Sequence, residues 1–151
     1  MYIKTLLLTI LLMTAPLLAL ATESADLKKQ IFMDQKKLVV MENMELSDDA
    51  AKNFWPVYGK YQEKLFNNAQ KRGEVIASYA SVYQDMSDSQ ALELVEDYYR
   101  TQDERLALMK QYAKELKTVL PGNKVFRYLQ VENKLEAIAR FEMAKGIPLA
   151  R

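Results

Sequence analysis

The chain of 151 residues contains neither cysteine nor histidine. Without cysteine it cannot form disulfides, and without both residue types it lacks the usual ligands of transition metals. Histidine is also the commonest general base, so neither a Ser/His/Asp nor a Cys/His catalytic site can be built. No glycine-rich phosphate loop occurs either. We therefore expect a protein that is not an enzyme and that has no metal site and no cofactor.

Glycine and proline are scarce, with only four of each in the chain. These residues dominate tight turns, so little material is available for β-hairpins. Basic residues are not in excess, because removal of a leader containing Lys4 reduces the 21 lysines and arginines to 20, against 20 acidic residues. A nucleic-acid-binding surface would need a basic excess. The composition predicts an all-α protein that does not bind nucleic acid.

The first 21 residues have the pattern of a cleavable signal peptide. Lys4 provides a positive start, residues 5–18 are mostly apolar, and Ala19-Leu20-Ala21 places small residues before the expected cleavage point. A membrane anchor is the alternative, but Pro16 and the A-x-A ending favour cleavage. We expect a periplasmic protein whose residues 22–151 form a single all-α domain, with no membrane span left after cleavage.

Hydrophobic residues at helical spacing predict four helices. The first covers about residues 24–45, the second begins near Asp48, the third follows Ser87, and the fourth covers about residues 123–145. The predicted buried seam of the second helix is Phe54, Tyr58, Tyr61, Leu65, Asn68, Arg72, Val75, Tyr79 and Val82. That of the third is Leu92, Val95, Tyr99, Gln102, Leu106, Met109, Ala113, Leu116 and Leu120.

Capping signals mark the ends of these helices. Ser47 can accept hydrogen bonds from free amides, and Asp48 suits the positive end of the second helix. Ser87 and Gln90 have the spacing of a capping box at the third helix. The third helix is expected to stop at Leu120, because the residue before Pro121 avoids the helical region.

Two of the predicted helices exceed thirty residues, which corresponds to roughly 45 to 55 Å at 1.5 Å per residue. We therefore expect an elongated, cradle-like, antiparallel four-helix architecture joined by short loops. A thin monomer buries little core per residue, so dimerisation is also expected.

Short motifs at the helix starts resemble those of the Spy/CpxP-type periplasmic proteins, which carry "LTxxQ" elements. Leu46-Ser47-Asp48-Asp49-Ala50 keeps the leucine and the hydroxyl, Met86-Ser87-Asp88-Ser89-Gln90 keeps the hydroxyl and the glutamine, and Leu120-Pro121-Gly122-Asn123-Lys124 keeps the leucine. The resemblance implies an antiparallel homodimer that holds unfolded proteins without ATP as a chaperone, or that serves the envelope stress response. The alternative is a regulatory partner of a membrane sensor's periplasmic domain, without general chaperone activity.

The stretch "NFWPVYGKY", residues 53–61, contains the only tryptophan of the chain. Pro56 lies inside the second helix and should bend it by about 20° or more, because it removes a backbone hydrogen bond. Phe54, Tyr58 and Tyr61 are expected to turn inward around that bend. Trp55 lies about 100° from Phe54 around the helix and is the best candidate for a surface contact.

Five side chains are candidates for binding a protein partner: Trp55, Tyr58, Tyr61, Arg72 and Arg127. Tyrosine and tryptophan suit non-specific surfaces because they combine an apolar body with a polar tip, although the same aromatics could simply pack the helices together. Arg72 belongs to a basic strip that could recognise acidic partners or could be solvated. Arg127 is expected to reach across to another helix or to a second subunit.

Overall fold

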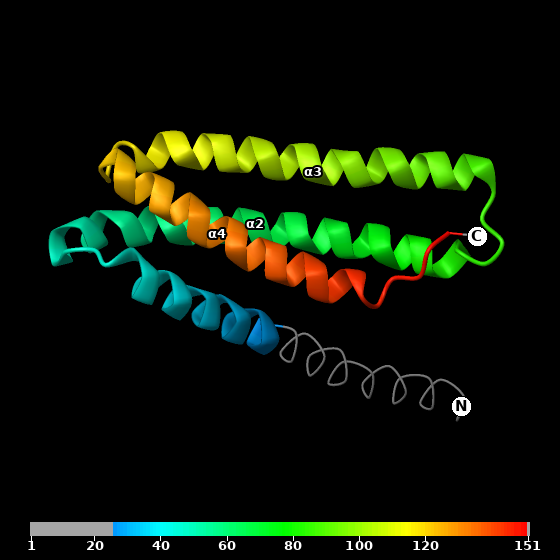
Figure 1. Ribbon diagram of the computed structural model, residues 1–151, viewed down its shortest axis with the longest axis horizontal. Coiled ribbons are helices and arrows are strands. Elements are labelled where there is room, and N and C mark those ends of the chain that lie inside the picture. The colour runs from blue at the N-terminus through cyan, green and yellow to red at the C-terminus, as the bar shows by residue number, and fades with distance from the viewer. Residues whose placement is uncertain (1–25, 151) are drawn as a thin grey trace, which may run out of the picture. The chain divides into compact units, whose positions relative to one another are not determined.

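The computed structural model describes residues 26–150, which fall into two compact units, one ending at Val39 and one beginning at Val40 (Figure 1). The regular secondary structure of the described residues is entirely helical, without strands, which confirms the predicted all-α, four-helix fold. The predicted signal peptide lies outside the described residues. The first helix is described over residues 26–44, close to its predicted range.

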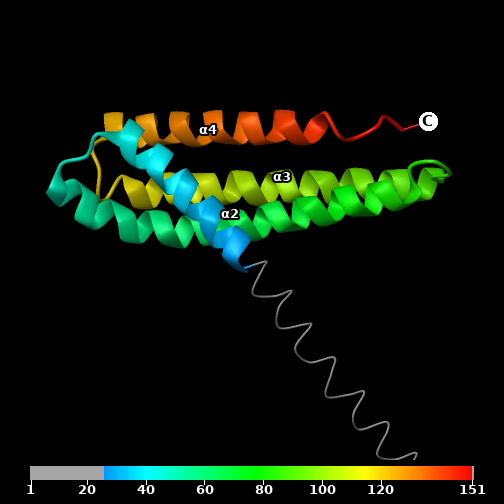
Figure 2. The same cartoon turned by 90° about the horizontal axis from the view of Figure 1, so that it is seen from below.

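Three further helices follow: α2 (Asp48–Val82), α3 (Asp88–Leu116) and α4 (Gly122–Ala144). Figures 1 and 2 show α2 and α3 as an antiparallel pair, with α4 returning alongside them in the direction of α2. The α4 helix has 23 residues against 35 in α2, and an irregular C-terminal tail continues beyond its end. The three helices therefore pack fully at one end of this unit and incompletely at the other.

The predicted caps are present at the starts of α2 and α3. The Ser47 hydroxyl accepts a hydrogen bond from the Ala50 amide at 3.4 Å. At α3, the Ser87 hydroxyl accepts from the Gln90 amide while the Gln90 side-chain oxygen accepts from the Ser87 amide at 2.9 Å, which completes the capping box. These reciprocal bonds satisfy amides that the helix itself leaves free, so both helix starts are where the sequence predicted them.

The end of α3 differs from the prediction by one helical turn. The helix ends at Leu116, and turns over the next residues include a hydrogen bond from the Leu120 amide to the Leu116 carbonyl at 2.8 Å. Leu120 is thereby folded back into the core, and Pro121 adopts an extended conformation as the N-cap residue of α4. The helix thus ends before Pro121, as predicted, but the four residues that precede the proline form the turn in which the chain reverses its direction.

The core of the C-terminal unit is built from buried side chains of all its helices. Its members are Val40, Met44, Phe54, Tyr58, Tyr61, Tyr112, Leu116, Leu120, Val125 and Tyr128. The rings of Tyr61 and Tyr112 stack across the α2–α3 contact with centroids 3.8 Å apart. Every residue of the predicted α2 seam is buried or half-buried, which confirms that seam.

The predicted seam of α3 is wrong over its first half. Leu92 and Tyr99 are 66% and 60% exposed, and Val95 and Leu106 are also exposed. Thr101, Tyr112 and Leu116 are the residues of α3 that are buried. Apolar residues lie on two neighbouring faces of α3, so their spacing alone does not determine which face packs against α2.

The polar break in the α2 seam is a buried hydrogen-bonding position. Asn68 is buried, and its side-chain amide donates to the Thr101 carbonyl of α3 at 3.0 Å. Lys71, one turn of α2 further on, pairs with Glu104 of α3 at 2.9 Å. Because buried amides are stable only when they are hydrogen-bonded, Asn68 fixes the register of the α2–α3 pair.

Pro56 lies inside α2, which continues as one helix from Asp48 to Val82. Its ring is on the exposed side of the helix. A proline removes one backbone donor, but this position is compatible with an unbroken helix. The bend itself stays a prediction.

A buried carboxyl group lies at the centre of the core. Glu132 of α4 is 1% exposed and accepts hydrogen bonds from the Tyr128 hydroxyl at 2.8 Å and from the Gln62 side-chain amide at 3.2 Å. Gln62 also donates to the Tyr128 hydroxyl at 3.0 Å. These three residues connect α2 to α4 through a polar network that apolar packing surrounds.

Tyr128→Phe should lower the free energy of unfolding by about 1–3 kcal/mol, because it removes a buried donor to Glu132 and an acceptor for Gln62. Tyr58→Phe is the matched control, since the Tyr58 hydroxyl is buried without a hydrogen-bond partner among the described residues. That change should be neutral or stabilising. Urea unfolding of both variants measures the difference. Equal effects of the two substitutions would contradict a stabilising role for the network.

Candidate ligand-binding cavity

The structure places the five predicted partner-binding side chains in three different settings. Tyr58 and Tyr61 are each 4% exposed and belong to the core, so the assignment of these two rings to a partner surface is corrected. The reason is that both lie on the α2 seam that faces α3 and α4. Their inward orientation was the other prediction made from the sequence, and it is confirmed.

Trp55 is half-buried at the edge of the core and is not a separate surface aromatic. Its ring makes edge contacts with Phe54 at 4.9 Å and with Tyr58 at 5.3 Å between centroids. The large indole reaches from its own side of α2 back to these neighbours. The angular separation from Phe54 therefore does not keep Trp55 out of the core.

Arg127 reaches another helix of the same chain. Its guanidinium donates to the Asn43 carbonyl and pairs with the Glu45 carboxylate at 2.9 Å. Lys124, one turn earlier on α4, donates to the carbonyls of Met44 and Glu45. The two cations thus bind carbonyl groups at the C-terminal end of the first helix, where positive charge is favourable.

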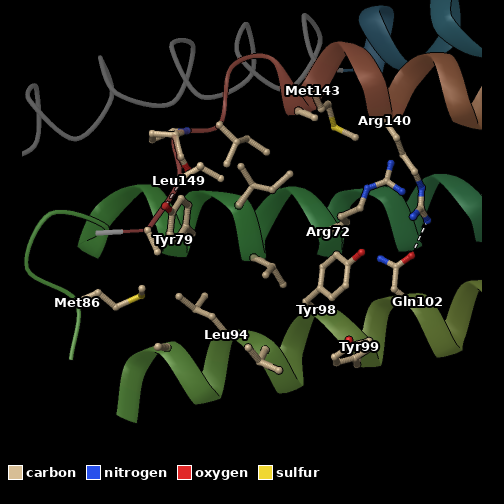
Figure 3. Close-up of a pocket in the computed structure, with 18 residues that line it drawn as sticks. Arg72, Tyr79, Met86, Leu94, Tyr98, Tyr99, Gln102, Arg140, Met143 and Leu149 are labelled. Carbon is tan, nitrogen blue, oxygen red and sulfur yellow. Dashed lines mark hydrogen bonds between the residues drawn. The ribbon is translucent and has the colours of Figure 1, made fainter. Parts of the chain in front are cut away.

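Arg72 lines a cavity in the C-terminal unit. The cavity has a volume of about 680 Å³ and lies where α2, α3, the end of α4 and the C-terminal tail meet (Figure 3). Most of its lining is apolar: Val75, Ile76, Tyr79, Met86, Ala91, Leu94, Val95, Tyr98, Tyr99, Met143, Ala144, Ile147, Pro148, Leu149 and Ala150. Its volume is in the range of sites that bind small molecules.

The C-terminal tail forms one wall of the cavity. The Tyr79 hydroxyl of α2 donates to the Pro148 carbonyl at 2.8 Å, and Figure 3 shows Leu149 next to Tyr79. The tail also stays close to α4 through a hydrogen bond from the Ile147 amide to the Ala144 carbonyl. A single side-chain bond to α2 therefore fixes this apolar segment across the open end of the helices.

Three exposed residues form the mouth of the cavity on α3: Val95, Tyr98 and Tyr99. Each lines the cavity and also presents much of its side chain to solvent. Leu92, one turn nearer the start of α3, extends this apolar surface. Contiguous exposed apolar surface of this kind marks an interaction site more often than isolated exposed residues do.

One end of the cavity is cationic. Arg72, Gln102 and Arg140 line it, and Figure 3 shows the two guanidinium groups and the glutamine amide gathered at this end, with the hydrogen bond from Arg140 to Gln102 at 2.6 Å as a dashed line. Glu136 is the shared acceptor of this cluster, at 2.6 Å from both Arg72 and Arg140. Arg105 lies 3.5 Å from the same carboxylate oxygen.

The arginines decide the ionisation of Glu136. Burial acts to raise its pKa, but the hydrogen bond from Arg140 and the charges of Arg72 and Arg105 lower it below the ordinary value of a glutamate. The carboxylate is therefore ionised at neutral pH. Because three guanidinium groups face this one carboxylate, the cluster keeps an excess of positive charge.

Most of this site was not identified from the sequence. The sequence indicates Arg72 as a candidate, but it does not single out Arg105, Glu136 or Arg140. The spacing of Glu136 and Arg140 by one helical turn is a usable signal for an ion pair. The three arginines come from three different helices, however, so only the packing of α2, α3 and α4 brings them together.

Comparisons of the chain with protein-family models, with curated proteins and with solved structures found no match. Within residues 26–150, no helix has the length and the apolar character needed to cross a membrane. The same residues include no cluster of acidic side chains that could hold a metal ion.

Proposed function

We propose that this chain is a periplasmic, non-enzymatic binding protein that captures apolar segments of unfolded proteins without ATP, as a chaperone or as an accessory of the envelope stress response. The observation that supports this proposal best is the apolar cavity that opens through Val95, Tyr98 and Tyr99 onto exposed surface. Exported proteins that are unfolded expose the apolar side chains that such a surface binds.

Capture at this site would rest on apolar burial. Each square ångström of apolar surface removed from water contributes roughly 25 cal/mol, so a few side chains entering the cavity mouth would give weak, reversible binding. The aromatic rings at the mouth offer apolar faces together with polar hydroxyl groups, which suits binding without sequence specificity. No covalent step and no nucleotide are required.

An aggregation assay with a denatured model substrate tests this proposal. Stoichiometric amounts of the protein should suppress light scattering, and Val95→Ser should weaken the suppression several-fold because it makes the cavity mouth more polar. Leu106→Ser is the matched control: Val95 and Leu106 are 50% and 49% exposed on the same helix, but Leu106 does not line the cavity. Absence of suppression by the wild-type protein, or equal loss in both variants, would refute capture at this mouth.

A pulldown from periplasmic extract separates the proposal from its alternative. Capture of many unrelated proteins supports a chaperone. Recovery of a single partner in a salt-sensitive complex would instead support the regulatory partner of a membrane sensor, which would bind through charged surfaces.

We also propose that the chain forms a homodimer. Phe126, Ile138 and Phe141 of α4 are all more than 60% exposed, and an interface between two copies would remove this apolar surface from water. Light scattering coupled to size-exclusion chromatography measures the mass. A monomer at all concentrations would refute the dimer.

A further inference from the structure

We infer that the cavity binds a long-chain carboxylate, with the acyl chain along the apolar lining and the carboxylate at the cationic end formed by Arg72 and Arg140. This inference goes beyond capture of unfolded proteins and does not depend on it. It rests on the distribution of charge along the cavity, on its scarcity of hydrogen-bonding groups, and on its size.

The charge at the cationic end favours an anion. Arg72 and Arg140 both line the cavity, and both pair with the single carboxylate of Glu136. Arg105 pairs with the same carboxylate. Among the described residues, Arg140 donates through Nε to Glu136 and through Nη2 to Gln102, which leaves its Nη1 group for a further acceptor. Guanidinium groups bind carboxylates through charge-assisted hydrogen bonds, so a second carboxylate would use donors that Glu136 leaves free.

The interior of the cavity favours an acyl chain over a peptide backbone, whereas the side chains of a captured segment need to enter only its mouth. Its lining is mostly aliphatic and aromatic, and the Tyr79 hydroxyl already donates to the Pro148 carbonyl. A peptide backbone that entered the cavity would bring amide groups that need partners, and a buried amide without a partner costs several kcal/mol. A hydrocarbon chain has no such groups, and it gains from the removal of its surface from water.

Figure 3 shows that the polar and the apolar side chains of the lining lie at different ends of the cavity. Arg72, Arg140 and Gln102 lie at one end, and Tyr79, Met86 and Leu149 lie toward the other. The volume of about 680 Å³ falls within the range of roughly 300–1,000 Å³ that is typical of small-molecule sites. The cavity can therefore accept a ligand that has a polar head at one end and an apolar body along the lining.

Calorimetric titration of the full exported protein with myristate, below the concentration at which myristate forms micelles, tests the inference. We expect one myristate per chain, and binding of methyl myristate, which lacks the charge, should be about tenfold weaker or more. An acetylated apolar octapeptide with a free C-terminal carboxylate serves as a second probe. Absence of myristate binding, equal binding of the methyl ester, or binding of the peptide in place of myristate would each overturn the inference.

Three variants locate the carboxylate end of the ligand. Arg140→Gln should weaken myristate binding about tenfold or more, and Arg140→Lys, which keeps the charge, should recover part of it. Arg100→Gln is the matched control, because Arg100 is an exposed arginine of α3 that pairs with Asp97 and does not line the cavity. Melting curves confirm that each variant is folded. Equal binding by the Arg140→Gln and Arg100→Gln variants would overturn the placement of the carboxylate.

This test is independent of the aggregation assay. If myristate does not bind but aggregation is still suppressed, the inference fails and the proposed function stands. If myristate binds and aggregation is not suppressed, the inference stands and the proposed function fails.

Discussion

Above pH 10 the protein should lose stability steeply and unfold within about two pH units. Burial raises the pKa of four core tyrosines, and the negative charge of Glu132 raises it further; the four are Tyr58, Tyr61, Tyr112 and Tyr128. In the unfolded chain the same hydroxyl groups ionise near pH 10. The native state therefore holds more protons than the unfolded state above that pH, so stability falls as pH rises.

The expected size of this effect is large. Each tyrosine that stays protonated only in the native state removes about 1.4 kcal/mol per pH unit, which amounts to about 5 kcal/mol per pH unit for four rings. Domains have total stabilities of about 5–15 kcal/mol, so a rise of one to two pH units is sufficient for unfolding.

Far-ultraviolet circular dichroism and tyrosinate absorbance, followed together as pH is raised, measure this transition. Ionisation of the buried rings should coincide with the loss of helix. Replacing Tyr58 and Tyr61 by phenylalanine should move the transition to higher pH, because two of the four linked groups are then absent. Ionisation of all the tyrosines near pH 10 with the helices intact would contradict the burial of these rings.

Phe54→Ala should lower the free energy of unfolding by about 3–5 kcal/mol, the usual cost of truncating a fully buried aromatic. Phe54 is 0% exposed, and its ring contacts those of Trp55, Tyr58 and Tyr128. The cavity left by the change would lie where α2 packs against α4, so neighbouring side chains could collapse into it only in part.

Trp55→Ala is the matched comparison, on the neighbouring position of the same helix. Because Trp55 is only half-buried, its removal should cost about 1–2 kcal/mol, less than the loss of Phe54. Urea unfolding of both variants gives the two values. A larger loss for Trp55→Ala would mean that the indole, not the phenyl ring, is the main packing element at this end of α2.

Local signals in the sequence predicted the helices well. Ser47, Ser87 and Gln90 marked helix starts because capping depends on residues within one turn. The α2 seam was also predictable, since its apolar spacing is regular and all of its residues are buried or half-buried. The seam of α3 was not, because the face that packs depends on how α4 is placed, and α4 covers only part of α3.

The cavity could not be predicted from the sequence for the same reason. It arises because α4 ends before α2 does and because the C-terminal tail crosses the gap. The predicted polar break at Asn68 and Arg72 was a partial indication that polar groups lie at this position of α2. The burial of Asn68 is explained by its hydrogen bond to the Thr101 carbonyl. The role of Arg72 in a cationic cluster becomes visible only when α3 and α4 place Arg105 and Arg140 beside the same carboxylate.

We propose above all that the cavity at the open end of α2, α3 and α4 is the site that binds segments of unfolded proteins. The most direct test is the aggregation assay repeated with Leu94→Trp, since Leu94 lines the cavity (Figure 3) and a larger side chain there would occupy its space. We predict that this variant keeps its helical signal and its melting temperature but loses most of its ability to suppress aggregation. Suppression equal to that of the wild-type protein, in a variant whose cavity is filled, would contradict the claim.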